Sequence, residues 1–305
     1  MTPTSRHIAI VAPSGYAADP EALNRAATRL RAQGHQVHDF CSAFKKYQRF
    51  AASDADRVQQ LHDAARHPEV EIVIALRGGY GLSRLLPTID FGLLADSGKH
   101  FIGHSDFTAL HLGLLAKTGA VSFAGPMICD DFSRADISEF TESHFWQCLN
   151  GPMTVEISAL DNPSVDVQGK LWGGNLSMIN HLIGTPWMPA VEGGILFIED
   201  VNEHPYRIER MLLQLLHAGV LARQQAVILG DFSGYRLSDY DNGYDFNAML
   251  ACLRAQLPVP LLHGLPFGHT PHKLTLPVGA LCRLRSDQTG MQLACSDYPG
   301  LQPST

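Results

Sequence analysis

One serine of this 305-residue chain lies at a turn between two apolar segments, where it could act as a nucleophile. In FIGHSDFT (101–108), a short apolar run ends at Gly103, and an apolar, helix-like segment begins after Ser105. Such a corner exposes a hydroxyl as a nucleophile, with the backbone N–H of Asp106 available for an oxyanion. The match to the G-x-S-x-G nucleophile elbow is partial, because Phe107 stands at the second glycine position. Since serine is also a preferred helix N-cap, the local sequence by itself favours the capping role.

A glycine-rich segment, RGGYG (77–81), follows another apolar run. Its glycines let the backbone approach a ligand closely or arrange N–H groups into an anion-binding nest, although a plain tight turn is about as well supported. The chain contains no G-x-x-x-x-G-K-[ST] sequence, and Arg84 occupies the last position of a G-x-G-x-x-G motif. The sequence therefore gives no support for nucleotide binding by this segment.

Two acidic residues and a histidine complete the set of candidate catalytic groups. Glu199 and Asp200 end the apolar run GILFIED, where a buried carboxylate needs a partner. We expect Asp200 to cap the following helix, whereas Glu199 has no such structural explanation. His269 lies in a loop rich in glycine and proline, GLPFGHT (264–270), where a side chain that titrates near neutrality is well placed for acid–base chemistry.

Other histidines offer competing interpretations, because the chain contains 15 of them. His104 adjoins Ser105, and His111 lies on the helix-like segment that follows, but neighbouring residues at a turn usually project in different directions. The segment 263–272 holds three histidines without an H-E-x-x-H motif or an acid at ligand spacing. We therefore predict no metal at the site.

The elements that must position these groups alternate in the first half of the chain. Apolar runs typical of buried strands are separated by helix-like stretches, which predicts a parallel sheet covered on both faces. Ligands of such sheets bind beyond the carboxyl ends of the strands, where RGGYG and GHSD both lie. The apolar runs are residues 7–12, 71–76, 100–103 and 120–125.

The pattern of apolar residues changes near residue 152. We predict an N-terminal α/β domain of the Rossmann or flavodoxin type over residues 1–152, a turn-rich linker over 153–166, and a C-terminal α/β domain over 167–305. The C-terminal domain has strong strands at 194–199 and 226–232 and then short strand-like pieces. Its end is therefore expected to be more antiparallel and richer in β-strands.

Composition narrows the class of protein. Hydrophobic residues make up 45% of the chain, and no stretch approaches the ~18 consecutive apolar residues of a membrane-spanning helix. The net charge of -7, with no basic run, gives no electrostatic footprint for nucleic acid. The six cysteines are scattered and form no C-x-x-C pair, so we expect reduced thiols in a cytoplasmic protein.

Five motifs occur together in a fixed order: RGGYG, GHSDFT, KLWGGNLSMI, GGILFIEDV and GLPFGHT. With this set, the sequence resembles the LD-carboxypeptidases, or muramoyltetrapeptide carboxypeptidases, over nearly the whole chain. This serine peptidase family also includes the microcin C self-immunity enzymes. The resemblance implies a triad in which Ser105 is the nucleophile, His269 is the general acid and base, and Glu199 orients His269. It also implies two domains with the site between them.

The resemblance further implies release of a C-terminal D-residue, typically D-alanine, from a murein tetrapeptide during cytoplasmic cell-wall recycling. It implies a homodimer, no cofactor, and a small peptide as the partner rather than a nucleic acid or a membrane. A glycine nest or a nearby arginine, with Arg77, Arg84 and Arg236 as the candidates, would bind the terminal carboxylate. Our candidates for oxyanion and substrate contacts are Asp106, Gly78, Gly79, Tyr80 and Trp172, the last of which is either a wall of the cleft or part of the core.

Two alternatives stay open. The first is a peptidase with the same triad that acts on peptide–nucleotide conjugates, which would need an aromatic platform supplied by Trp172 or Trp187. The second is a non-catalytic binding protein of similar architecture, which predicts that Ser105, Glu199 and His269 do not converge.

Overall fold

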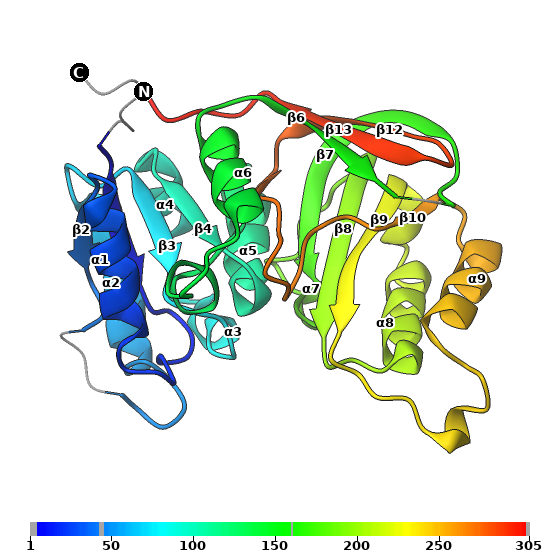
Figure 1. Ribbon diagram of the computed structural model, residues 1–305, viewed down its shortest axis with the longest axis horizontal. Helices are drawn as coiled ribbons and strands as arrows, with labels where there is room; N and C mark the ends of the chain where they lie inside the picture. Colours follow the sequence, from blue (N-terminus) through cyan, green and yellow to red (C-terminus); the bar gives the residue numbers. More distant parts are fainter. Residues whose placement is uncertain (1–4, 43–45, 160, 303–305) are drawn as a thin grey trace.

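Two β-sheets standing side by side form the frame of the protein (Figure 1). The structure is a computed structural model, and it describes residues 5–42, 46–159 and 161–302. Helices α5 (Thr108–Thr118) and α7 (Leu176–Leu182) contact each other between the two sheets (Figure 1). None of the described helices is both long enough and apolar enough to cross a membrane.

The first sheet has six strands in the order β11-β5-β4-β3-β1-β2, and it contains the parallel strands that the sequence predicts. Strands β3 and β4 are buried along their whole length, which is why they are continuous apolar runs. The edge strand β2 (Gln36–Asp39) was not predicted, because Val37 is its one apolar residue. The other parallel strands are β1 (His7–Val11), β3 (Ile72–Ala75), β4 (His100–Gly103) and β5 (Ser122–Ala124).

Helices connect the strands of the first sheet. The N-cap of α2 is Ser53, whose hydroxyl accepts a hydrogen bond from the backbone N–H of Asp56. Asp90 caps α4 in the same way through the N–H of Leu93. The helices of this half are α1 (Ala22–Ala32), α2 (Asp54–Arg66), α3 (Leu82–Leu85), α4 (Phe91–Asp96), α5 and α6 (Glu139–Leu149).

Strand β11 (Leu276–Val278) joins the first sheet although it comes from the end of the chain. It pairs with β5 in the antiparallel direction, and all three of its residues are buried. The six-stranded sheet is therefore completed by residues from the C-terminal half.

The second sheet has seven strands in the order β10-β9-β8-β7-β12-β13-β6. Neighbours from β10 to β7 are parallel, and neighbours from β7 to β6 are antiparallel. The predicted α/β class with a more antiparallel end is confirmed. The strands are β6 (Met153–Ser158), β7 (Val165–Asn175), β8 (Gly194–Val201), β9 (Gln224–Ser233), β10 (Leu261–His263), β12 (Leu281–Ser286) and β13 (Gly290–Ser296), and α8 (Pro205–His217) and α9 (Phe246–Gln256) pack beside them.

The structure differs from two further expectations, which concern the linker and the cysteines. Of the segment 153–166 that we expected to be a linker, residues 153–158 form β6 and pair with β13, and Val165 begins β7. The expectation that all six cysteines are reduced is wrong for two of them. Cys282 and Cys295 lie directly opposite each other on β12 and β13 and form a disulfide.

Candidate active site

Ser105 lies at a sharp turn between β4 and α5, and its backbone is in the left-handed region with φ +60°. This conformation is strained for a residue other than glycine, and such strain is concentrated at functional sites. The N-cap of α5 is Phe107, so the capping role that the local sequence favoured for Ser105 is wrong. A Cβ on Gly103 would lie 2.6 Å from the ring of Phe107. The tight elbow therefore forms with one glycine, and Phe107 fills the space that this glycine leaves.

The glycine-rich turn after β3 lies directly against Ser105. A Cβ built on Gly78 would come within 2.9 Å of Ser105 Oγ and 3.6 Å of the backbone nitrogen of Asp106. Gly79 follows with φ +107°, a conformation that side chains rarely adopt. The next residue, Tyr80, is exposed, and its ring lies tilted against that of Phe50, with the centroids 5.9 Å apart. The turn therefore holds backbone close to the hydroxyl, as an oxyanion-binding role would require.

Gly78→Ala tests the closeness of this turn. We expect kcat/KM to fall by about 10²-fold, because an added methyl group would displace the Ser105 hydroxyl by a large part of an ångström. Because the added Cβ would also lie 2.8 Å from Ser105 Cβ, some loss of thermal stability should accompany the loss of activity, so circular dichroism must show that the variant is folded under the assay conditions. Gly92→Ala, on the exposed surface of α4, is the matched control and should keep full activity. Equal activity of both variants would contradict a catalytic role for the turn.

The carboxyl group of Asp106 connects three segments around Ser105. Its Oδ2 accepts hydrogen bonds from the hydroxyl of Ser14 and, at 2.9 Å, from the backbone N–H of Leu82. Burial raises the pKa of this carboxyl, although both hydrogen bonds act in the opposite direction. The side chain is therefore a support for the loops, and only the N–H of Asp106 remains a candidate for contact with substrate.

Glu199 and His269 are joined by a short hydrogen bond, in which His269 Nδ1 donates to Glu199 Oε2 at 2.7 Å. Glu199 is fully buried at the end of β8, whereas the His269 side chain is 22% exposed. Gly268 has φ +144°, and a Cβ there would lie 3.3 Å from Glu199 Cβ. Since Nδ1 carries the donated proton, Nε2 of His269 is left as the basic nitrogen.

Asn175 is a positioning residue that the sequence analysis did not identify. It pairs with Glu199 across parallel strands β7 and β8, and its Nδ2 donates to Glu199 Oε1 at 3.3 Å and to Asp200 Oδ1 at 2.9 Å. Its backbone N–H donates to the hydroxyl of Thr108 at the start of α5. Asn175 therefore connects the end of β8, which carries Glu199, to the start of α5, the helix that follows Ser105. The only signal in the sequence was its place at the end of WGGN.

Asp200 has a different role from the one we expected. Its Oδ2 accepts from the N–H and the hydroxyl of Ser177, at 2.9 and 2.7 Å, in the first turn of α7. The following helix, α8, is capped by His204 instead. Asp200 reaches the first turn of α7 because this helix begins directly after Asn175, which lies opposite Glu199 on the neighbouring strand.

The competing histidines are structural. His104 is buried, its Nδ1 donates to the carbonyl of Gly125 at 2.9 Å, and burial holds its pKa well below the ordinary value. His111 is also buried, and its two ring nitrogens bond to Ser122 Oγ and to the carbonyl of Gly103. The ring of His269 lies edge-on against His104, with the centroids 5.1 Å apart. This contact brings the Glu199–His269 pair next to the residue that precedes Ser105.

Two histidines of segment 263–272, His269 and His272, have different partners. His269 bonds to Glu199, whereas His272 Nδ1 bonds to the hydroxyl of Ser138 next to α6.

Trp172 does not line the site, so its place among the substrate-binding candidates is corrected. The side chain is fully buried in the second sheet, and its indole N–H donates to Gln224 at 2.8 Å. A side chain that is closed off from solvent on all sides cannot contact a substrate. Of the two interpretations open from the sequence, the structure supports the core.

The hydrogen bond between Glu199 and His269 leads to a prediction about the pH dependence of the rate. Burial lowers the pKa of His269, but the hydrogen bond and the charge of Glu199 outweigh burial, so the pKa is raised above 6.5. Only neutral His269 can accept a proton from a serine, and therefore kcat/KM should fall as the pH drops below this raised pKa. Rates measured between pH 5 and 9 check this. A rate that is flat down to pH 5 would contradict the role of His269 as the base.

Comparison with known proteins places this arrangement in a family. The model of the LD-carboxypeptidase N-terminal domain matches residues 8–125, and that of the C-terminal domain matches residues 168–284. A probable murein peptide carboxypeptidase from Bacillus subtilis (strain 168) is 32% identical over 278 residues, which are 90% of this chain and 86% of the relative.

Solved structures agree with the family models. The crystal structure of muramoyltetrapeptide carboxypeptidase from Oxalobacter formigenes is 54% identical and has a TM-score of 0.92, over 96% of this chain and 99% of that one. A microcin C7 self-immunity protein, 24% identical with a TM-score of 0.86 over 96% of each chain, shares the fold. The two family models and the similarity to these relatives show that this chain belongs to the LD-carboxypeptidase family and is a serine-type carboxypeptidase.

Proposed function

We propose that the protein releases C-terminal D-alanine from murein tetrapeptide-like peptides with a triad of Ser105, His269 and Glu199. The observation that carries the proposal is the 2.7 Å hydrogen bond between buried Glu199 and His269, beside the strained turn of Ser105. The name of the 54% identical relative, a muramoyltetrapeptide carboxypeptidase, supports this substrate class. A non-catalytic binding protein would have no need for an oriented base next to a strained serine.

The proposed reaction begins when His269 Nε2 takes the proton of Ser105 Oγ as the hydroxyl attacks the last peptide carbonyl. Glu199 keeps the proton on Nδ1 and stabilises the imidazolium that forms. The N–H groups of Asp106 and Gly79 hold the negative oxygen of the tetrahedral intermediate. His269 then protonates the leaving amine of D-alanine, and a water molecule activated by the same imidazole hydrolyses the acyl-enzyme.

For the terminal carboxylate of the substrate we propose Arg77. It immediately precedes Gly78, it is half-buried, and one of its guanidinium nitrogens donates to the carbonyl of Tyr16 at 3.1 Å. Arg84, another arginine near the turn, is already paired with Asp54 at 2.7 Å. A guanidinium next to the glycine turn suits a carboxylate, because it forms charge-assisted hydrogen bonds to both oxygens.

Peptide–nucleotide conjugates fit this site less well than murein peptides. Such substrates would need an aromatic platform for the base, and Trp172, one of the two candidates, is buried in the second sheet. Trp187 is partly buried and packs against the core. This observation favours the tetrapeptide substrate.

We also propose that the protein acts in the cytoplasm, in the recycling of cell-wall peptides, and as a homodimer. These three statements rest on the family resemblance. Light scattering of the purified protein tests the dimer, and a mass equal to one chain would exclude it.

The test of the proposed function is mass spectrometry of a tetrapeptide incubated with the purified protein. We expect loss of one alanine when the C-terminal residue is D-alanine, and no loss when it is L-alanine. A peptide–adenylate conjugate serves as the competing substrate. Cleavage of the conjugate alone, or of the L-alanine peptide at an equal rate, would exclude the proposed specificity.

A further inference from the structure

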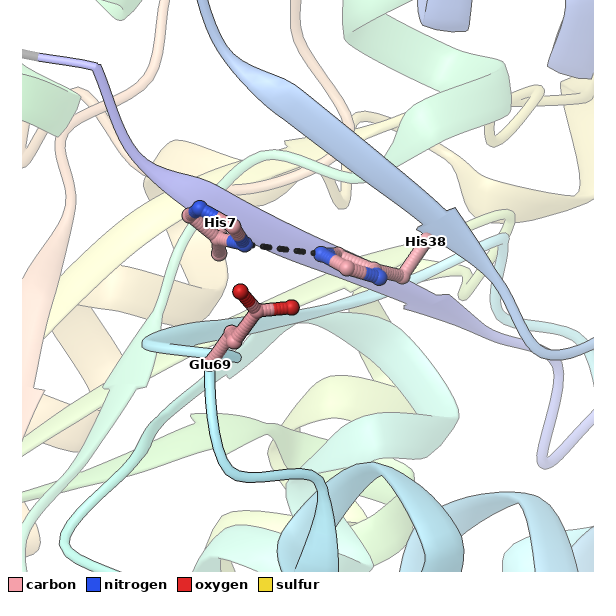
Figure 2. A group of neighbouring side chains, drawn as sticks. All are labelled: His7, His38 and Glu69. Carbon is pink, nitrogen blue, oxygen red and sulfur yellow. Dashed lines mark hydrogen bonds between the residues drawn. The ribbon is translucent and has the colours of Figure 1, made fainter.

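A second group of polar side chains lies on the first sheet, away from the active site (Figure 2). It consists of His7 on β1, His38 on β2, and Glu69 in the connection between α2 and β3, and their possible ligand atoms all lie within 4.8 Å of one another. We propose that these three residues bind a divalent transition-metal ion of the zinc type. Figure 2 shows the two rings and the carboxylate pointing toward a common centre.

The spacing of the two imidazoles suits one shared ion. His7 Nδ1 and His38 Nε2 are 3.0 Å apart. Two nitrogens that each lie about 2.0–2.1 Å from a tetrahedral zinc ion are themselves roughly 3.3 Å apart. Without a metal ion, one of the two nitrogens carries a proton and donates it to the other in a hydrogen bond. Binding an ion requires only that this proton is released and that the rings move apart by a few tenths of an ångström.

The backbone that carries the three ligands is fixed by the fold. Strands β1 and β2 are parallel neighbours, with Ala9 aligned to His38. The turn that carries Glu69 is fastened by the ammonium group of Lys99, which donates to the carbonyls of His67 and Val70 at 2.6 Å each. The ligands therefore come from three segments that do not need to rearrange before an ion binds.

The chemical types of the three ligands indicate which ion would bind. Two imidazoles with one carboxylate form a donor set typical of zinc, whereas magnesium and calcium prefer oxygen ligands.

The location indicates that the ion would stabilise the fold rather than take part in the reaction. His7 begins β1, and Glu69 precedes β3, so both lie toward the amino ends of the parallel strands. Ser105 follows the carboxyl end of β4 at the opposite edge of the sheet. An ion at this place would tie the edge strand β2 to β1 and to the loop before β3.

Zinc titration of the full chain tests the site. The protein must carry no polyhistidine tag and be freed of metal with EDTA before calorimetry with ZnCl₂. We expect one ion per chain and a rise in unfolding temperature of about 5 °C when free zinc is a hundred-fold above its Kd. His38→Ala and Glu69→Gln should each weaken binding by more than about 100-fold, because each loses a direct ligand.

Two controls decide the location of the ion. His217→Ala, at the exposed end of α8, and His269→Ala, in the active site, should both bind zinc as tightly as the wild type. Loss of binding in His269→Ala would place the ion at the triad and overturn the proposal. So would undetectable binding to the wild type, or unchanged binding in Glu69→Gln, a surface substitution that leaves the fold intact.

Discussion

Ser105→Ala is expected to lower kcat for D-alanine release by about 10⁴-fold or more, because it removes the oxygen that is proposed to form the acyl-enzyme. The substitution deletes one oxygen, and alanine has no greater difficulty than serine with the φ of +60°. The unfolding temperature should therefore stay close to that of the wild type. Single-turnover assays with a tetrapeptide, followed by mass spectrometry, measure the loss.

Ser143→Ala is the matched control for this prediction. Ser143 lies on the exposed face of α6, where its hydroxyl donates to the carbonyl of Phe140, and its loss should leave the rate unchanged. If Ser105→Ala released D-alanine at the wild-type rate, Ser105 would be a structural residue of the turn. The proposed covalent mechanism would then be wrong.

Glu199→Gln is expected to lower kcat by about 10⁴-fold through the tautomer of His269. A glutamine can present its amide nitrogen to His269 Nδ1, which then accepts a hydrogen bond, so that the proton moves to Nε2. The nitrogen that should receive the serine proton is then already protonated. Glutamine can still accept the hydrogen bond from Asn175, so the surrounding structure should be kept.

The same variant should change the pH dependence in a defined direction. Glu199 opposes burial in setting the pKa of His269, so its neutralisation should move the acidic limb of the residual activity to lower pH. Glu192→Gln, which alters an exposed carboxylate paired with Arg223, should change neither the rate nor the limb. If the variant kept residual activity and its rate fell at the same acidic pH as that of the wild type, the carboxylate of Glu199 would not set the pKa of His269.

Much of the fold was predictable from the sequence, because the buried parallel strands are apolar along their whole length. Strand β2 was not, since QVHD at the edge of a sheet needs little apolar surface. Strand β11 was not predictable as part of the first sheet, because its three residues do not indicate which sheet they join.

The candidate site was predictable to a different degree at each residue. The ordered motifs suggested Ser105, Glu199 and His269, and the structure joins the last two directly. Asn175 was missed, because an asparagine after two glycines is equally typical of a turn. Trp172 was placed at the cleft as one of two possibilities, since a sequence does not tell which face of β7 an indole occupies.

The group of His7, His38 and Glu69 could not have been found from motifs. His7 and His38 are 31 positions apart, and their rings meet only because β1 and β2 are neighbours in the sheet. Motifs for metal sites depend on short spacings within one helix or loop. A site assembled across strands has no such signature.

The pairing of β11 with β5 has a consequence for how the protein is made. The ribosome synthesises the segment with Ser105 long before Leu276–Val278, so β5 remains an unpaired edge until nearly the whole chain has emerged. Folding of the first half during translation must therefore stay incomplete. The sheet that positions Ser105 is therefore completed by a strand that is synthesised after both Glu199 and His269.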